Sequence, residues 1–258
     1  MTKYQKRSIS MIMKLKKYIS KIIIGINLLW FSCHTPQRGG DINNAKIWLI
    51  GETHRVEWIY DMEFTRWKEL YDSGYRHLFI ELGYHQGEYL NLWMKSEDDA
   101  VLSNLFSDWE ELVRMDYTQG SYGFYKRIKQ ECPLTVFHGV DVGHQHPVTG
   151  EIFLEYLNEN NLQDSEQYAL TIEAIEQGAR FYDENTSEYD RWKYREYTMA
   201  QNFIREYDKL ENGRIMGIFG YAHTNYNKYS PNGNYPNMAK QLRSHYGNIL
   251  YYENYIQK

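Results

Sequence analysis

The sequence predicts a single α/β domain in which helices flank a central, mainly parallel sheet. Apolar runs recur along the chain between longer amphipathic stretches, and strands that alternate with helices in this way form right-handed βαβ units. The part of the chain after residue 33 is about 225 residues long, which is enough for one domain with a sizeable core. We therefore expect residues 46–258 to form one such domain.

The first 33 residues have the order of a secretory signal peptide. Lysines precede an apolar stretch at residues 22–31 that is too short to span a bilayer comfortably. The Ser-Cys pair ending at Cys33 resembles the end of a bacterial lipobox, whose cysteine is lipidated, although Trp30 replaces the usual aliphatic residue. We expect export and a lipid anchor at Cys33, on the periplasmic or cell-envelope face of a bacterial membrane. The alternative is an N-terminal membrane anchor that is not cleaved.

The elements follow one another in a regular alternation. Residues 34–45 contain Gly and Asn and are expected to form a linker. Short apolar runs predict strands at residues 46–50, 77–81, 134–141, 214–219 and 248–253. Amphipathic stretches predict helices at residues 57–73, 87–94, 122–130, 152–158, 165–177, 189–210 and 237–245. The acidic stretch 181–190 is expected to be a solvated loop before the longest helix.

Composition and missing motifs exclude several classes of function. The net charge is −5 without a long Lys/Arg run, which argues against nucleic-acid binding. The 25 Tyr residues suit ordinary packing or, alternatively, a wet, aromatic-lined cleft. Only two cysteines occur, so Cys132 has no disulfide partner if Cys33 is lipidated. The sequence has no G-x-S-x-G elbow, Walker loop, G-x-G-x-x-G after a strand or HExxH, which argues against serine hydrolysis, nucleotide hydrolysis and dinucleotide redox chemistry.

Four predicted strands each place a chemically useful side chain at or just past their carboxyl end. His54 follows the first strand, Glu81 closes the second, Asp141 closes the third and His223 follows the fourth. In open parallel sheets these ends share one edge, where ligands bind. The sequence therefore predicts a functional site at this edge.

Two of these histidines belong to G-x-x-H motifs at strand exits, residues 51–54 and 220–223, where Gly permits a sharp turn. One interpretation is a divalent metal (Zn, Mn or Co) held by His54, Glu81, Asp141 and His223. A second is metal-free chemistry in which His54 is a general base steered by Glu52 or Glu81. The structural alternative is that each His caps a loop and bonds to backbone. His138 points to the opposite face of its strand, and the loop residues His144 and His146 are likewise set aside.

The longest predicted helix carries further polar candidates on one face. Trp192, Arg195, Met199 and Asn202 recur at helical spacing, and Trp and Met there suit the core. A buried Arg pairs with a carboxylate or an anionic ligand, so Arg195 is expected to bind Asp141, Glu81 or substrate. Asn202 and Tyr221 are expected to contact substrate.

Five motifs, in order and spacing, resemble a known group of proteins. They are "LIGETH", "LFIELG", "HGVDV", "YREYTMAQN" and "IFGYAHTN". They resemble the erythromycin esterase-like, ChaN-like and Tiki/TraB group, also called the haem-binding uptake superfamily, over residues 46–226. Erythromycin esterases hydrolyse macrolide lactones with a His in the first motif and nearby glutamates, which implies roles for His54, Glu52 and Glu81.

The resemblance also has departures. The first motif has one residue fewer between Glu and His than in erythromycin esterases, and the last motif keeps only the second His, His223. Tiki-like peptidases carry two G-x-x-H motifs with a metal, which this sequence matches better. In the helix motif, Glu196 replaces the usual Asp.

Together these features predict an exported hydrolase that cleaves an ester or amide of a small molecule or peptide with water. His54 is expected to be the base or a metal ligand, with Glu52 and Glu81 as its partners. His223 is expected to be a ligand or electrophile, and Arg195 to stabilise developing negative charge. The alternative is a ChaN-like lipoprotein that binds haem for haem or iron uptake, and a degenerate scaffolding member is a third possibility.

Overall fold

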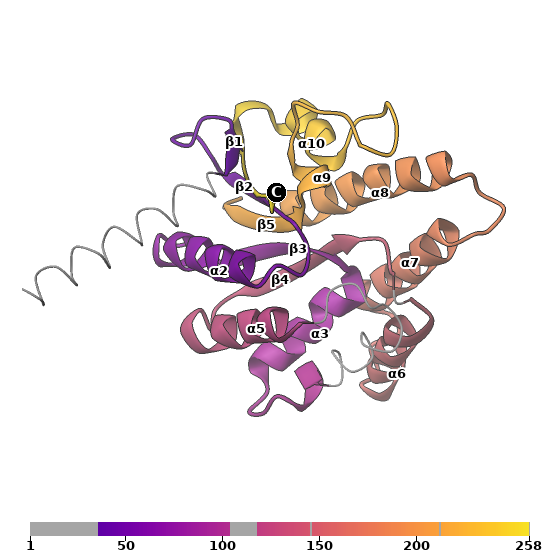
Figure 1. Cartoon of the computed structure of the whole chain (residues 1–258). Coiled ribbons are helices and arrows are strands. Elements are labelled where there is room, and N and C mark those ends of the chain that lie inside the picture. The colour runs from indigo at the N-terminus through magenta and orange to yellow at the C-terminus, as the bar shows by residue number, and fades with distance from the viewer. Residues whose placement is uncertain (1–35, 104–117, 145, 212, 258) are drawn as a thin grey trace, which may run out of the picture. The chain divides into compact units, whose positions relative to one another are not determined.

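The computed structural model describes residues 36–103, 118–144, 146–211 and 213–257 (Figure 1). The predicted signal peptide and Cys33 lie outside the described residues, so export and the lipid anchor remain predictions. All elements given below belong to one compact unit, Gln37–Lys258. Among the helices in the described part of the chain, none is both long and apolar enough to cross a membrane.

The unit is built on a six-stranded sheet that is parallel except at one edge. In spatial order the strands are β1 (Gln37–Gly39), β6 (Leu250–Tyr255), β2 (Ile47–Glu52), β5 (Ile215–Gly220), β3 (His77–Gly83) and β4 (Val136–Asp141). Only β1 runs antiparallel to its neighbour. The predicted mainly parallel sheet is therefore confirmed, and the carboxyl ends of β2 to β6 meet at one edge.

Helices follow the strands in the predicted alternation. Their bounds are α2 (Glu57–Asp72), α3 (Tyr84–Lys95), α5 (Gln119–Glu131), α6 (Glu151–Glu159), α7 (Glu166–Phe181), α8 (Glu188–Asp208), α9 (Tyr221–Thr224) and α10 (Met238–Tyr246). A π-helical turn, His146–Gly150, precedes α6, and a 3₁₀ turn, Gly247–Ile249, precedes β6. α3 begins earlier than predicted because the Gln86 side chain accepts a hydrogen bond from the Gly83 amide and caps the helix.

Alternate residues of the strands bury the two faces of the sheet in two separate cores. Trp48 and Ile50 of β2 pack on one face against α2, α3 and α5. Ile47 and Leu49 of the same strand pack on the other face against α8 and α10. Helices on both faces of a parallel sheet leave its carboxyl edge as the place where loops gather.

The predicted linker contains an unexpected strand, β1. It pairs with β6, and Arg38 donates a hydrogen bond to Glu253 at 2.8 Å. Glu253 is 1% exposed, so this ion pair ties the segment to the sheet. The sequence alone does not predict β1 because the segment is short, polar and stabilised by a partner far along the chain.

Truncation of Phe203, a core residue of α8, should destabilise the domain strongly. Phe203 is fully buried between the rings of Phe79 and Phe219. We expect Phe203→Ala to lower the free energy of unfolding by about 3–5 kcal/mol through lost transfer energy and a residual cavity. Urea unfolding measures this loss. Tyr197→Ala, on the same helix but 57% exposed, is the matched control and should change stability by no more than about 0.5 kcal/mol.

Candidate active site

Arg195 lies at the centre of a buried cluster of ion pairs at the carboxyl edge of the sheet. The residue is 7% exposed. Its Nε donates to Asp141 Oδ1 at 3.0 Å, and its Nη2 donates to Asp141 Oδ2 and to Glu81 Oε1, each at 2.5 Å. Asp141 closes β4 and Glu81 lies near the end of β3. One side chain of α8 therefore joins two neighbouring strand ends, so Arg195 pairs with both of the carboxylates predicted for it.

These ion pairs fix the charge of both carboxyl groups. Burial opposes ionisation of Glu81, but the nearby His223 and Arg195 outweigh it and lower the pKa of Glu81 to about 2. Burial opposes ionisation of Asp141 as well, yet Arg195 and His144 hold its pKa well below the usual range. Despite its own burial, Arg195 has a raised pKa because it faces both carboxylates.

His223 connects this cluster to a second buried carboxylate. It lies in α9, directly after β5, and its Nδ1 is 2.9 Å from Glu196 Oε1. Its Nε2 is 3.5 Å from Glu81 Oε1 and 3.4 Å from Arg195 Nη1. Burial lowers the pKa of His223, but Glu196 and Glu81 outweigh that effect and raise it. The His223 imidazolium is thus favoured.

Glu196 was not predicted as a site residue, and its place is fixed by tertiary contacts. Its Oε2 accepts a hydrogen bond from the Met238 amide at 2.7 Å, which ties α8 to the first turn of α10. The sequence signal that points to it is its position beside Arg195 in the helix motif. It holds His223 from one side while Arg195 and Glu81 contact it from the other.

His54 and Glu52 form a pair on the other side of Glu81. His54 Nδ1 is 2.9 Å from Glu52 Oε1. The His54 side chain is 39% exposed, whereas Glu52 is 14% exposed. Arg55, the next residue, has φ 64°, a left-handed conformation that is strained for a residue other than Gly and turns the chain directly after the imidazole.

His144 belongs to the site, although the sequence reasoning set it aside as a loop residue. Its Nε2 is 3.1 Å from Asp141 Oδ2, and its Nδ1 is 2.7 Å from the Tyr182 hydroxyl. The chain turns back immediately after β4, which brings the ring over the strand end. Tyr182 comes from the stretch that was predicted to be a solvated loop. His138, as predicted, lies elsewhere and contacts His77 instead, while the side chain of His146 is not among those described.

The clustered side chains open into a cleft of about 600 Å³. His54, Glu81, Arg195 and His223 lie along it. The lining also includes aromatic and charged side chains, among them Phe181, Tyr182, His144, Glu188, Arg191 and Trp192. The Phe181 and Trp192 rings pack edge to face at 5.3 Å between centroids. A substrate with apolar rings therefore has surfaces to pack on beside the charged groups.

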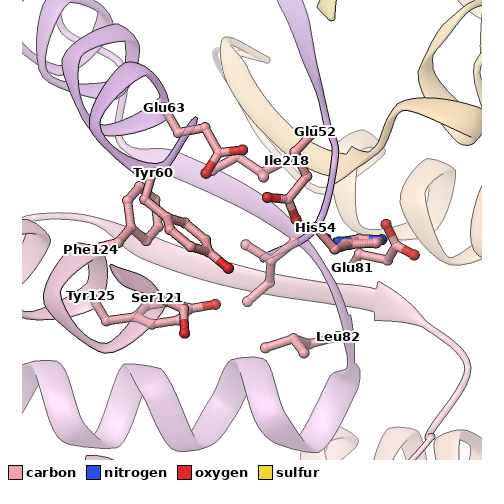
Figure 2. A pocket seen from close by; sticks show the side chains of 11 residues that line it. Glu52, His54, Tyr60, Glu63, Glu81, Leu82, Ser121, Phe124, Tyr125 and Ile218 are labelled. Carbon is pink, nitrogen blue, oxygen red and sulfur yellow. Dashed lines mark hydrogen bonds and ion pairs between the residues drawn. The ribbon is translucent and has the colours of Figure 1, made fainter. Parts of the chain in front are cut away.

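A second, smaller pocket of about 60 Å³ meets the cleft at His54 and Glu81 (Figure 2). It is mostly apolar, and its walls come from α2, α5, the strands β2, β3 and β5, and His54. Its lining comprises Glu52, His54, Tyr60, Glu63, Ile80, Glu81, Leu82, Ser121, Phe124, Tyr125 and Ile218. Figure 2 shows Glu63 and Glu52 directed into this pocket from α2 and β2. Sequence reasoning missed Glu63 because it lies on an ordinary amphipathic helix.

Two residues predicted to bind substrate lie away from both pockets. Asn202 is 4% exposed and donates to the Val140 carbonyl at 3.1 Å, so it fastens α8 to β4. It lies further along α8 than Arg195 and also bonds to the side chain of Gln177 on α7. Tyr221 is 46% exposed and is not part of the lining of either pocket.

Three of the four predicted metal ligands, Glu81, Asp141 and His223, contact other protein side chains in this structure. Among the described residues, no group of three or more His, Cys, Asp or Glu side chains is arranged to hold a metal ion. Asp141 and Glu81 are both bound to the guanidinium of Arg195. Both ring nitrogens of His223 and of His144 have protein partners. A bound metal and the haem alternative both remain predictions.

Neither a protein-family model nor a curated protein matches the sequence. Solved structures, however, share its fold. One is the erythromycin esterase EreC, as a histidine-to-asparagine mutant in its open conformation, with a TM-score of 0.59, 13% identity, and coverage of 81% of this chain and 69% of that chain. A second is a Bacillus cereus protein with a TM-score of 0.57, 15% identity, and coverage of 80% of this chain and 64% of that chain.

A third similar structure is described as a succinoglycan biosynthesis protein. It has a TM-score of 0.55, 15% identity, and coverage of 81% of this chain and 65% of that chain. The present chain thus spans only part of the length of these solved chains. At these identities the similarity establishes the fold alone, and the chain has an erythromycin esterase-like α/β fold.

Removal of the Arg195 guanidinium should destabilise the protein, because Asp141 and Glu81 would remain buried without a counter-charge. We expect Arg195→Met to lower the free energy of unfolding at pH 7 by about 3–5 kcal/mol, because Asp141 and Glu81 lose their counter-charge. The lowered pKa values of the wild type make its ion-pair stabilisation present at neutral pH and lost as pH falls. The difference between the proteins should therefore shrink in urea unfolding as the pH is lowered from about 4.5 toward 2. A difference independent of pH would contradict this account, and Lys193→Met, exposed on the same helix, is the control.

The raised pKa of His223 should depend on Glu196. The stability that protonated His223 contributes to the folded protein is fully present below the ordinary histidine pKa of 6.5. This contribution is lost as the pH rises through the raised pKa of His223 in the folded state. We expect Glu196→Gln to lower the pKa of His223, measured by histidine-ring NMR through a pH titration. The exposed Glu188→Gln on the same helix should leave the titration unchanged. An unaltered His223 titration in Glu196→Gln would show that Glu196 does not hold the imidazolium.

Proposed function

We propose that this chain is a hydrolase that uses water to cleave an ester or amide in a small molecule or peptide. The single observation that carries the proposal is the His54–Glu52 pair, which lies beside the buried Arg195–Glu81–His223 cluster and lines the same cleft. An orientated imidazole next to fixed cations is an arrangement that suits acyl transfer to water. The likeness to the fold of an erythromycin esterase supports this reaction class.

His54 acts as the general base. Glu52 accepts a hydrogen bond from His54 Nδ1–H, which leaves Nε2 as the basic nitrogen. Nε2 takes a proton from water as the water oxygen attacks the carbonyl carbon. The resulting His54 imidazolium is stabilised by Glu52 and then returns the proton to the leaving alcohol or amine. Carboxylic acid and alcohol, or amine, are released, and His54 regains its neutral form.

Arg195 and His223 stabilise the negative charge that develops on the carbonyl oxygen. Both line the cleft, and both are held by carboxylates, so they need no rearrangement during the reaction. His223 suits this role better than that of a base, because its raised pKa favours the imidazolium. His54, the more exposed of the two, is left to exchange protons with water.

Loss of the base should abolish turnover and leave the fold intact. We expect His54→Ala to lower kcat/KM by about 10²- to 10⁴-fold, as is usual for loss of a general base, because the partly exposed side chain contributes little to the core. The measurement is hydrolysis of a panel of aryl esters, lactones and amides by the domain, with thermal unfolding followed by circular dichroism. His245→Ala, an exposed histidine on α10, is the control. A fully active His54→Ala protein would refute the proposed mechanism.

A further inference from the structure

Glu63 is a buried carboxyl group that the proposed reaction does not use. It lies on α2, is 1% exposed and lines the small pocket among Tyr60, Phe124 and Ile218. Its Oε1 has no hydrogen-bond partner among the described residues. A buried carboxyl group in such surroundings needs either a counter-charge or a proton.

The groups that face Glu63 do not supply a counter-charge. The carboxyl group of Glu52 lines the same small pocket, and its negative charge raises the pKa of Glu63. Glu81, which also lines the pocket, is bound to Arg195. Tyr60, Ser121 and Tyr125 bring only hydroxyl groups, and His54 contacts Glu52.

The basic residue closest along α2 is engaged elsewhere. Arg66, one helical turn after Glu63, pairs with Glu69 and lies 3.2 Å from Glu253.

Two carboxyl groups in contact can form a hydrogen bond only if one of them carries a proton. Burial, and then the charge of Glu52, raise the pKa of Glu63 well above its usual value. Glu63 is the more buried partner and lacks a cation, so the proton belongs to Glu63.

We propose that Glu63 is a protonated positioning residue, which donates a hydrogen bond to Glu52 and thereby fixes the carboxylate that orients His54. The three side chains of Glu63, Glu52 and His54 thus form a connected series from the apolar interior to the cleft. The neutral donor holds Glu52 in place without adding a second negative charge beside the imidazole. The positioning role rests on the proposed function of His54 as a base, whereas the protonation of Glu63 does not.

Infrared spectroscopy tests the protonation without any substrate. The difference spectrum between wild type and Glu63→Gln at pH 7 should contain the carbonyl stretch of a protonated carboxylic acid, shifted by deuterium exchange and by ¹³C labelling of glutamate carboxyls. Glu69→Gln is the matched control, since Glu69 is on the same helix, 57% exposed and paired with Arg66. Its difference spectrum should contain carboxylate bands only. Absence of the acid band in the labelled wild type, which needs no mutant to fold, would overturn the proposal.

Stability provides a second readout of the same proton. A carboxyl group with a raised folded-state pKa contributes stability below its ordinary value of 4.5, and this contribution is lost as pH rises through the folded-state pKa. Glu63→Gln cannot ionise, so it should gain stability relative to wild type as the pH rises. Equal pH dependence in the two proteins would contradict a protonated Glu63.

Kinetics separate positioning from mere packing. Glu63→Gln keeps a donor for Glu52 and should retain both kcat and the pH profile of kcat/KM, whereas Glu63→Leu, which fills the space without a donor, should lose about tenfold or more of kcat. If Glu63→Leu is as active as wild type, the positioning role is refuted. If His54→Ala is fully active while the acid band is present, the proposed function fails and the protonated Glu63 stands.

Discussion

The buried ion pairs of Arg195 are the interaction on which the rest of the site depends. They join α8 to the ends of β3 and β4, and Glu81 extends the network to β5 by accepting a hydrogen bond from the Gly220 amide. Burying three charges is favourable only if every one is paired, so the guanidinium and both carboxylates must keep one geometry. The sheet edge is consequently rigid where the cleft opens, and the groups that line it are placed before any ligand arrives.

The two histidines differ in how they are joined to this network, and the difference bears on the roles that we propose for them. His223 lies inside the network, between Glu196 and Glu81, so its protonation affects the ion pairs that stabilise the fold. His54 lies outside it, on a strained turn at the cleft, and touches the network through Glu52 and the side of Glu81. A base must gain and lose a proton in each turnover, and it does so most easily where the surrounding charges do not depend on that proton. His54 satisfies this condition and His223 does not, which supports the proposed assignment of His54 as the base.

The sequence predicts the parts of this arrangement that follow from local pattern. Glu81, Asp141, His54 and His223 were found because polar residues at the ends of apolar runs must meet at one edge of a parallel sheet. His144, Glu196 and Glu63 were missed because their roles come from contacts between elements. His144 depends on how the chain turns after β4, Glu196 on the approach of α10, and Glu63 on the approach of α2 to β2. The same applies to β1, whose partner strand lies at the other end of the domain.

The structure explains the glycines of the two G-x-x-H motifs differently from the sequence pattern. The sequence suggests that they permit sharp turns, but Gly220 has φ −51°, a conformation open to any residue. What Gly220 provides is space, since a Cβ there would lie 2.8 Å from His54 Nε2 and 3.4 Å from Glu81 Oε2. A Cβ at Gly51 would likewise overlap the side chains of Asn254 and Thr224. The missing Cβ at Gly220 therefore allows the His54 ring to lie beside Glu81, whereas the missing Cβ at Gly51 allows Asn254 and Thr224 to pack against the end of β2.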